Sequence, residues 1–160
     1  MADMSLLGFI GHIAAFEHRL QHHGRAALER VGRAVEAEAK REIGTYQAGG
    51  GPFAAWAELA DSTKEDRVKQ GFTPNDPGLR SGEMRDSIGH AADHEGVVIG
   101  SDDDKLVWFE LGTAKQPPRS VLGLAVVHKE HEIKAHLGGG VVSALIGHDV
   151  FNGRLPIIGP

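Results

Sequence analysis

The sequence predicts an α+β fold in which a small antiparallel sheet is packed by a long N-terminal helix and a C-terminal helix. Apolar residues recur at helical spacing over residues 5–43 and again over about 119–136, and two short β-rich segments lie around Ile88 and Val98. The chain has 160 residues, of which 41% are hydrophobic and 24% are charged. This is enough for one domain with one core.

We expect that domain to span residues 1–151, with its core within 54–137. A C-terminal tail at 152–160 follows, and it is rich in glycine and proline.

The first element is a helix over residues 5–43, with Gly24 as a position for a bend and Gly44 as the C-cap. Its opposite face carries Glu-to-Arg and Glu-to-Lys pairs spaced i,i+4. A helix this long is hard to bury in a small domain, so we expect part of its apolar stripe to pack on a neighbouring subunit. The stripe residues expected there are Leu28, Val31 and Val35.

The middle of the chain predicts a short helix and a hairpin. Ser62 and Glu65 form a capping-box pattern that starts the helix, and Gly71 ends it. Residues 84–92 and 97–99 have strand character and are separated by a turn, so we expect them to pair as a β-hairpin.

The acidic run at 102–104 is expected to cap a helical turn over 106–111 that stops at Gly112. Glu110 lies in this turn among apolar residues. We expect its carboxylate to accept backbone N–H groups at the Gly112 turn or to pair with Arg119.

The last section predicts a helix over about 119–136, opened by two prolines. Three consecutive glycines at 138–140 are expected to break it, and a second helical piece follows at 141–146.

The chemistry of the chain excludes several functional classes. Cysteine is absent, and the net charge of −5 disfavours a dedicated DNA-binding regulator. There is no phosphate-binding loop and no serine elbow. We therefore expect no catalytic residue, cofactor or metal site.

The alternative from another class is a metal-dependent hydrolase that uses His128, His131 and His136. It is disfavoured because three residues, rather than two, separate the Glu after His131 from His136, unlike the His-Glu-x-x-His zinc motif.

Neither a signal peptide nor a membrane span is expected. The first residues lack basic character, and no apolar run approaches about 18 residues.

Short patterns occur in a fixed order over about residues 54–125. They are Trp56-x-x-Leu59-x-x-x-Thr63-x-x-x-Arg67, Leu79-x-x-Gly82-x-Met84-x-Asp86-Ser87-Ile88, Val98-x-Gly100-Ser101, Phe109-Glu110-x-Gly112-Thr113 and Pro117-Pro118-Arg119. In order and spacing, the chain resembles the tail-completion and head–tail joining proteins of long-tailed phages, the family often labelled phage virion morphogenesis protein.

The resemblance implies a non-enzymatic structural protein of the virion, located at the head–tail junction and assembled in the cytoplasm of the bacterial host. Such a subunit forms a hexameric or dodecameric ring and contacts neighbouring neck proteins, either head-closure and adaptor proteins or tail-terminator and tail-tube proteins. DNA passes through its lumen without sequence-specific binding. The equivalent part of a gene transfer agent or of a tailocin-like particle fits equally well.

A closed ring uses heterologous contacts, in which one face of each copy meets a different face of the next. We expect the interface to combine the stripe of the first helix with an aromatic anchor and its polar neighbours. The residues expected there are Leu28, Val31, Val35, Trp108, Phe109, Glu110 and Arg119.

Overall fold

The structure of the chain is a computed structural model that describes residues 6–147. Within that range the fold is α+β, as predicted, with six helices and one two-stranded antiparallel sheet. The expected tail at 152–160 lies outside the described residues. The elements are α1 (Leu6–Glu42), α2 (Asp61–Lys69), α3 (Glu83–Asp86), β1 (Ile88–Ala92), β2 (Val97–Ser101), α4 (Asp104–Leu111), α5 (Leu122–His128) and α6 (Glu130–Ile146).

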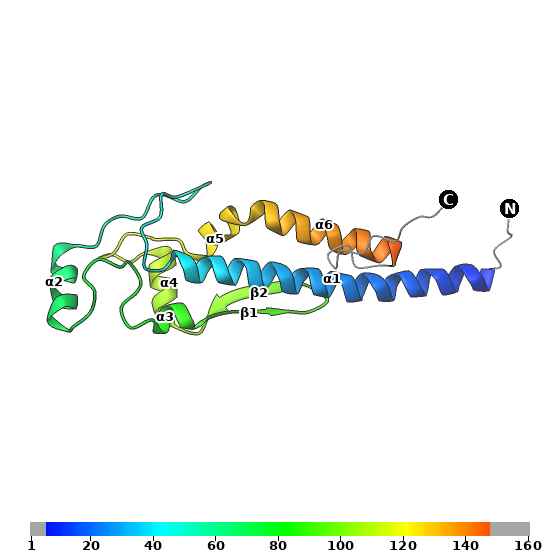
Figure 1. The fold of residues 1–160 in the computed structure, drawn as a ribbon, viewed down its shortest axis with the longest axis horizontal. Coiled ribbons are helices and arrows are strands. Elements are labelled where there is room, and N and C mark those ends of the chain that lie inside the picture. The colour runs from blue at the N-terminus through cyan, green and yellow to red at the C-terminus, as the bar shows by residue number, and fades with distance from the viewer. Residues whose placement is uncertain (1–5, 148–160) are drawn as a thin grey trace, which may run out of the picture.

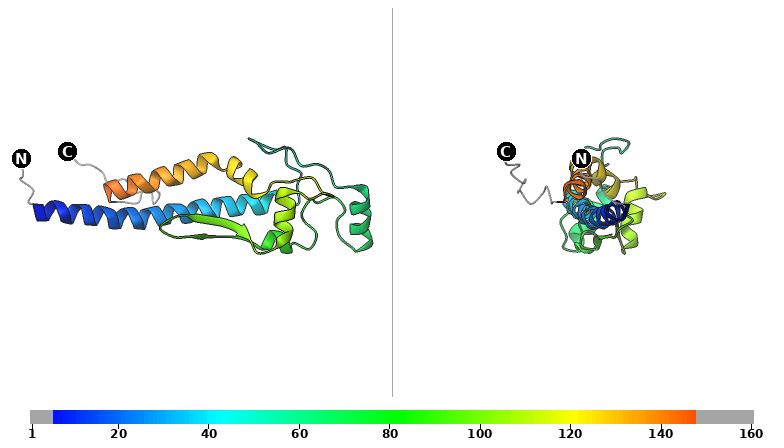
Figure 2. Two further views of the ribbon diagram at one scale, coloured as in Figure 1. Left: turned by 180° about the vertical axis from the view of Figure 1, so that it is seen from behind. Right: turned by 90° about the vertical axis from the view of Figure 1, so that its right-hand side faces the viewer.

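The molecule is elongated, and α1 runs along most of its length (Figure 1). The hairpin β1–β2 packs on one side of α1, and α5 and α6 pack on another, with α6 antiparallel to α1. The short helices α2, α3 and α4 and their loops gather around the C-terminal end of α1 (Figures 1 and 2). The first turns of α1 extend beyond the end of α6 in both side views.

The long N-terminal helix is confirmed. It runs without interruption through Gly24 and ends at Glu42. The predicted C-cap is also confirmed, because Gly44 takes a φ of 99° and donates its N–H to the carbonyl of Pro77 at 2.7 Å. That hydrogen bond ties the end of α1 to the loop that follows α2.

The hairpin forms in the predicted place, but its first strand is shorter. Residues 84–86 belong to the helical turn α3 rather than to the strand, which begins at Ile88. The hydroxyl of Ser87 donates to the carbonyl of Met84 at 2.8 Å and so closes the helical turn. Met84 is buried in the core. A buried apolar residue next to Ile88 is compatible with either a strand or a helical turn, so the sequence alone did not distinguish the two.

An ionic contact holds the hairpin on α1. His90 of β1 lies between two carboxylates of α1, with Nδ1 hydrogen-bonded to Glu36 and Nε2 3.2 Å from Oε1 of Glu29. The hydrogen bond to Glu36, assisted by Glu29, outweighs partial burial and raises the pKa of His90. Sequence reasoning missed this contact because its partners are more than 50 residues apart.

The N-terminal cap predicted for α2 is wrong, and the one predicted for α4 is correct. α2 begins at Asp61 rather than Ser62, and its N-cap is Ala60, whose methyl side chain cannot accept a hydrogen bond from the helix. The acidic run caps α4 as predicted, because the carboxylate of Asp103 accepts the N–H of Lys105 at 2.9 Å. α4 then stops at Gly112, which has a φ of 74°.

The predicted break at glycines 138–140 is wrong. The helix is interrupted at Lys129, and α6 continues through all three glycines. The physical reason lies at Gly140, where an added Cβ would lie 2.7 Å from the Cβ of Ala27 on α1. The absence of a side chain at Gly140 therefore lets two helices approach closely.

The core lies where α1, the hairpin, α4 and α5 meet. Trp56 and Phe109 make an edge-to-face contact with ring centroids 5.3 Å apart, and the Arg119 guanidinium lies over the Phe109 ring. The buried cluster consists of Val31, Val35, Ala39, Ile43, Trp56, Met84, Ile88, Leu106, Phe109, Val121 and Ala125.

Within residues 6–147, no helix combines the length and apolar character needed to cross a membrane.

The close approach at Gly140 gives a paired prediction on one helix. Gly140→Ala should lower the free energy of unfolding by about 1 to 3 kcal/mol, because the new Cβ meets Ala27. Gly138→Ala should instead raise it by up to about 1 kcal/mol, because no atom lies within 4 Å of that position and alanine favours a helix. Urea unfolding measures both. Equal effects of the two substitutions would contradict the packing described for α6.

Candidate functional site

Large apolar side chains are exposed over the half of the molecule that contains the start of α1. We call this group the distal surface, and its members are between 40% and 61% exposed. α1 and α6 lie side by side there, since Nε of Arg19 donates to the carbonyl of Ala144 at 3.2 Å. The distal surface comprises Ile10, Ile13 and Leu20 of α1 and Leu137, Val141, Val142, Leu145 and Ile146 of α6.

A second apolar group lies on α4, near the C-terminal end of α1 (Figure 1). Val107, Trp108 and Leu111 are 52%, 56% and 73% exposed, and their spacing places them on one side of the helix. We call them the α4 surface. An open groove of about 560 Å³ adjoins it, and Trp108, Lys105, Arg67 and Arg80 are among its lining residues.

Some of the predicted interface residues are exposed, and others are buried inside the chain. Trp108 is exposed and available to a partner, and Leu28 is partly buried. Val31, Val35 and Phe109, however, are at most 7% exposed and form the core of the single chain. Their placement at an interface was therefore wrong, because the hairpin and the helices α4 and α5 already cover them.

Glu110 caps α5. Its two carboxylate oxygens accept the N–H groups of Val121, Leu122 and Gly123 at 2.6, 2.9 and 3.1 Å and the hydroxyl of Ser120. The prediction that Glu110 accepts backbone N–H groups was correct in kind but wrong in location, since the groups belong to the start of α5 rather than to the Gly112 turn. The three N–H bonds satisfy backbone donors that the first turn of a helix leaves free.

Arg119 does not pair with Glu110. Its guanidinium donates from Nε to the carbonyl of Ala57 at 2.9 Å and from Nη2 to the carbonyl of Glu58 at 3.1 Å. Arg119 is 3% exposed, so it crosslinks two chain segments from inside the fold. Neither Glu110 nor Arg119 offers its charged group to a partner.

The histidines of the C-terminal section do not converge. His128 faces α1, His131 is exposed on α6, and His136 lies 3.6 Å from Glu132 on its own helix. The hydrolase alternative that needed all three together is therefore not supported by the arrangement of these side chains.

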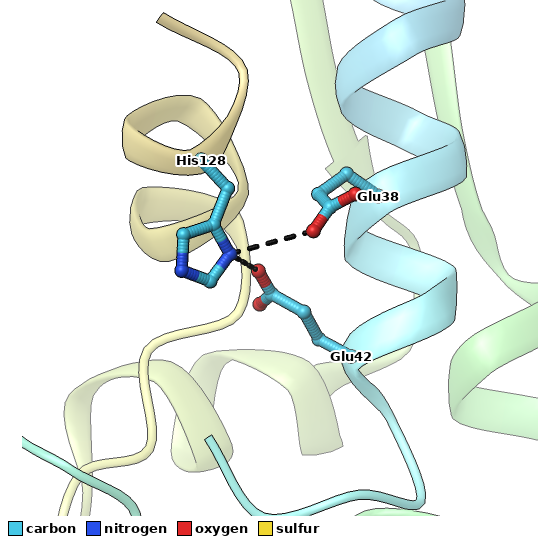
Figure 3. A group of neighbouring side chains, drawn as sticks. All are labelled: Glu38, Glu42 and His128. Atoms are coloured by element: carbon cyan, nitrogen blue, oxygen red, sulfur yellow. Dashed lines mark hydrogen bonds and ion pairs between the residues drawn. The ribbon is translucent and has the colours of Figure 1, made fainter. Parts of the chain in front are cut away.

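His128 instead joins two glutamates of α1, as Figure 3 shows. Its Nδ1 lies 2.8 Å from Oε1 of Glu42 and 3.4 Å from Oε1 of Glu38. The Glu42 side chain is fully buried, that of Glu38 is 5% exposed, and that of His128 is 33% exposed. Among the described residues, this is the group whose geometry could hold a metal ion.

The two glutamates have opposite electrostatic environments. Burial, together with the charge of Glu38, raises the pKa of Glu42 to about 8. Burial also acts on Glu38, but there the hydrogen bonds and charge of Arg41 and the charges of Lys129 and His128 outweigh it, and the pKa of Glu38 is lowered. Oε2 of Glu42 is buried and finds no hydrogen-bond partner among the described residues.

Sequence reasoning missed this cluster, although it left a signal. Val31, Val35, Glu38 and Glu42 follow one another at intervals of three and four residues, so both acids occupy positions of the buried stripe. Acidic residues on the buried side of a helix require a partner.

Comparison with known proteins finds no matching family model, no significantly similar curated protein and no significantly similar solved structure.

The cap on α5 gives a stability prediction. Glu110→Ala should lower the free energy of unfolding by about 1 to 3 kcal/mol, because several N–H groups at the start of α5 lose their acceptor. Glu95→Ala is the control, since the Glu95 side chain is 81% exposed in the hairpin turn. Thermal and urea unfolding compare the variants. A Glu110→Ala protein as stable as the control would refute the capping role.

The pKa of Glu42 gives a pH prediction for the protein in metal-free buffer. The folded state holds the Glu42 proton up to about pH 8, whereas the unfolded chain releases it near 4.5, so stability should fall as the pH rises between these values. Glu42→Gln should lose less stability than the wild type between pH 5 and pH 8. His90 also makes the free energy of unfolding fall as the pH rises through its raised pKa, because its stabilising charge is then lost. This contribution should remain in the variant. Urea unfolding across this range measures the difference. Parallel profiles would contradict the protonated state of Glu42.

Proposed function

We propose that this chain is a non-enzymatic structural subunit of a virion, a ring-forming tail-completion or head–tail connector protein at the neck of a long-tailed phage. The observation that carries the proposal is the pair of separate apolar surfaces on one chain. The distal surface lies toward the start of α1 and the α4 surface lies near its end. Exposed apolar groups of this kind are typical of protein–protein contacts.

Two different surfaces on one chain suit a heterologous contact. If the α4 surface of one copy meets the distal surface of the next, each copy uses both, and repetition gives a ring when the rotation between neighbouring copies closes on itself. Trp108 suits the centre of such a contact, because large aromatic side chains contribute strongly to binding when a partner buries them.

The residues that carry the family resemblance perform structural work, which supports a non-enzymatic role. Trp56 donates to the carbonyl of Ser120 at 3.1 Å, and Arg67 donates to the carbonyls of Asp76 and Leu79. The motif residues Glu110 and Arg119 are engaged in the cap and crosslink described above. The motifs thus define a scaffold, and the exposed surfaces lie largely outside them.

The charge of the chain suits a passage for DNA. With a net charge of −5 and exposed Asp102 and Asp104 next to the α4 surface, a ring of such subunits would repel rather than retain a polyanion. This agrees with DNA that moves through a lumen without sequence-specific binding.

The proposal is tested by deleting the gene from the phage genome and imaging the particles by negative-stain electron microscopy. We expect separate heads and tails and a loss of infectivity, both restored by the wild-type gene. Normal numbers of joined, infectious particles in the deletion strain would refute the proposal.

Complementation of the deletion strain with variants tests whether the α4 surface takes part in assembly. Trp108→Ser should fail to restore joining, because it removes the aromatic centre of the α4 surface. Val98→Ser is the matched control, since Val98 is 73% exposed on β2 and belongs to neither surface. Thermal unfolding should show that both variants fold. If Trp108→Ser folds and complements as well as Val98→Ser, the α4 surface has no role in assembly.

A further inference from the structure

The cluster of Glu38, Glu42 and His128 connects two helices that are distant in the sequence. Glu38 and Glu42 lie one turn apart near the end of α1, and His128 is the last residue of α5. Figure 3 shows the three side chains pointing toward one another from facing helices. One potential ligand atom from each residue lies within 4.8 Å of the other two.

The separations suit a shared metal ion. Two ligand atoms at about 2.1 Å from one zinc ion, at a tetrahedral angle, lie about 3.4 Å apart. Nδ1 of His128 is 2.8 Å from Oε1 of Glu42 and 3.4 Å from Oε1 of Glu38. One carboxylate oxygen of Glu38 and one of Glu42 also lie within 4.8 Å of each other, so side-chain rotations that shorten this separation bring all three atoms into coordination range.

A second observation favours a cation at this site. The Glu42 side chain is fully buried, yet its Oε2 has no hydrogen-bond partner among the described residues. A buried carboxylate oxygen without a partner is costly, and a bound cation supplies one.

The charged side chains around the two glutamates are compatible with a bound cation. Arg41 hydrogen-bonds Glu38 through Nε, at 3.2 Å, and through Nη2, but its side chain is 74% exposed and can move away. Lys129 acts on Glu38 through its charge, and Glu110 adds negative potential at Glu42. Among the described residues, the carboxylate of Glu42 has only the imidazole of His128 as a hydrogen-bond partner.

We propose that Glu38, Glu42 and His128 bind a divalent transition-metal ion, preferably Zn²⁺, that fastens α5 to α1. The mixed donor set determines this class, because an imidazole nitrogen favours zinc and its neighbours, whereas Ca²⁺ and Mg²⁺ prefer sites made of oxygen alone. The partial exposure of His128 gives the ion a route to the site and leaves a position for a water ligand.

The test uses untagged, chelator-treated full-length protein. Isothermal titration with ZnCl₂ should show one ion per chain, and saturation should raise the melting temperature, whereas MgCl₂ should do neither. Co²⁺, used as an optical probe, should give the visible absorption bands of a low-symmetry site with nitrogen and oxygen ligands.

Matched variants separate this site from the other histidines. His128→Ala should weaken Zn²⁺ binding at least about tenfold. His131→Ala should bind as the wild type does, since His131 is exposed on α6 away from the glutamates. Glu42→Gln, which keeps the size of the side chain, provides a second loss of a ligand if His128→Ala does not fold.

Three outcomes would overturn the proposal. They are the absence of saturable Zn²⁺ binding, Zn²⁺ binding that is unchanged in both His128→Ala and Glu42→Gln, and an equal stabilisation by Mg²⁺, which would exclude a site selective for transition metals.

Discussion

The fold depends on the packing of unrelated elements against the C-terminal half of α1. A two-stranded hairpin is marginal in water, and the hairpin, α5 and α6 all make their main contacts with α1. Residues from Ala27 to Ile43 present one buried side to the hairpin and another to α5 and α6. Val35 and Ala39, which are essentially inaccessible to solvent, lie at the centre of this arrangement. α1 is therefore the element that joins the hairpin, α5 and α6 into one core.

Polar contacts then determine how these elements connect. Glu110 joins α4 to the start of α5, Arg119 joins the segment before α5 to the chain near Trp56, and His90 joins the hairpin to α1. Each contact satisfies buried or partly buried polar groups, so each favours one arrangement over alternatives that would leave those groups unpaired. The apolar core supplies the driving force for folding, and these few contacts give it a unique geometry.

Local signals were sufficient for much of the fold. The helical spacing of α1, the glycine after it, the hairpin turn and the Asp103 cap all depend on neighbours in the sequence, and all were predicted. The glycines at 138–140 were misread, because Gly140 serves a contact with Ala27 that sequence spacing does not reveal. Phe109, Val31 and Val35 were assigned to an interface for the same reason. An apolar stripe shows that a side is buried, but the partner that buries it is a tertiary fact. In the glutamate–histidine cluster, His128 lies 86 or more residues from the two glutamates. The sequence pointed to His128 as a candidate metal ligand, but with the wrong partners, and both glutamates were missed.

The unequal covering of α1 has a consequence for how this single helix holds together. Its C-terminal half is secured by tertiary packing, so its amide hydrogens exchange only when much of the molecule opens. Near the other end, Ile10 and Ile13 are more than half exposed, and a helix with little tertiary support frays from its terminus. We therefore expect the two halves of this one helix to open separately, and a partner that covers the distal surface would also stabilise the helical turns near Ile10 and Ile13.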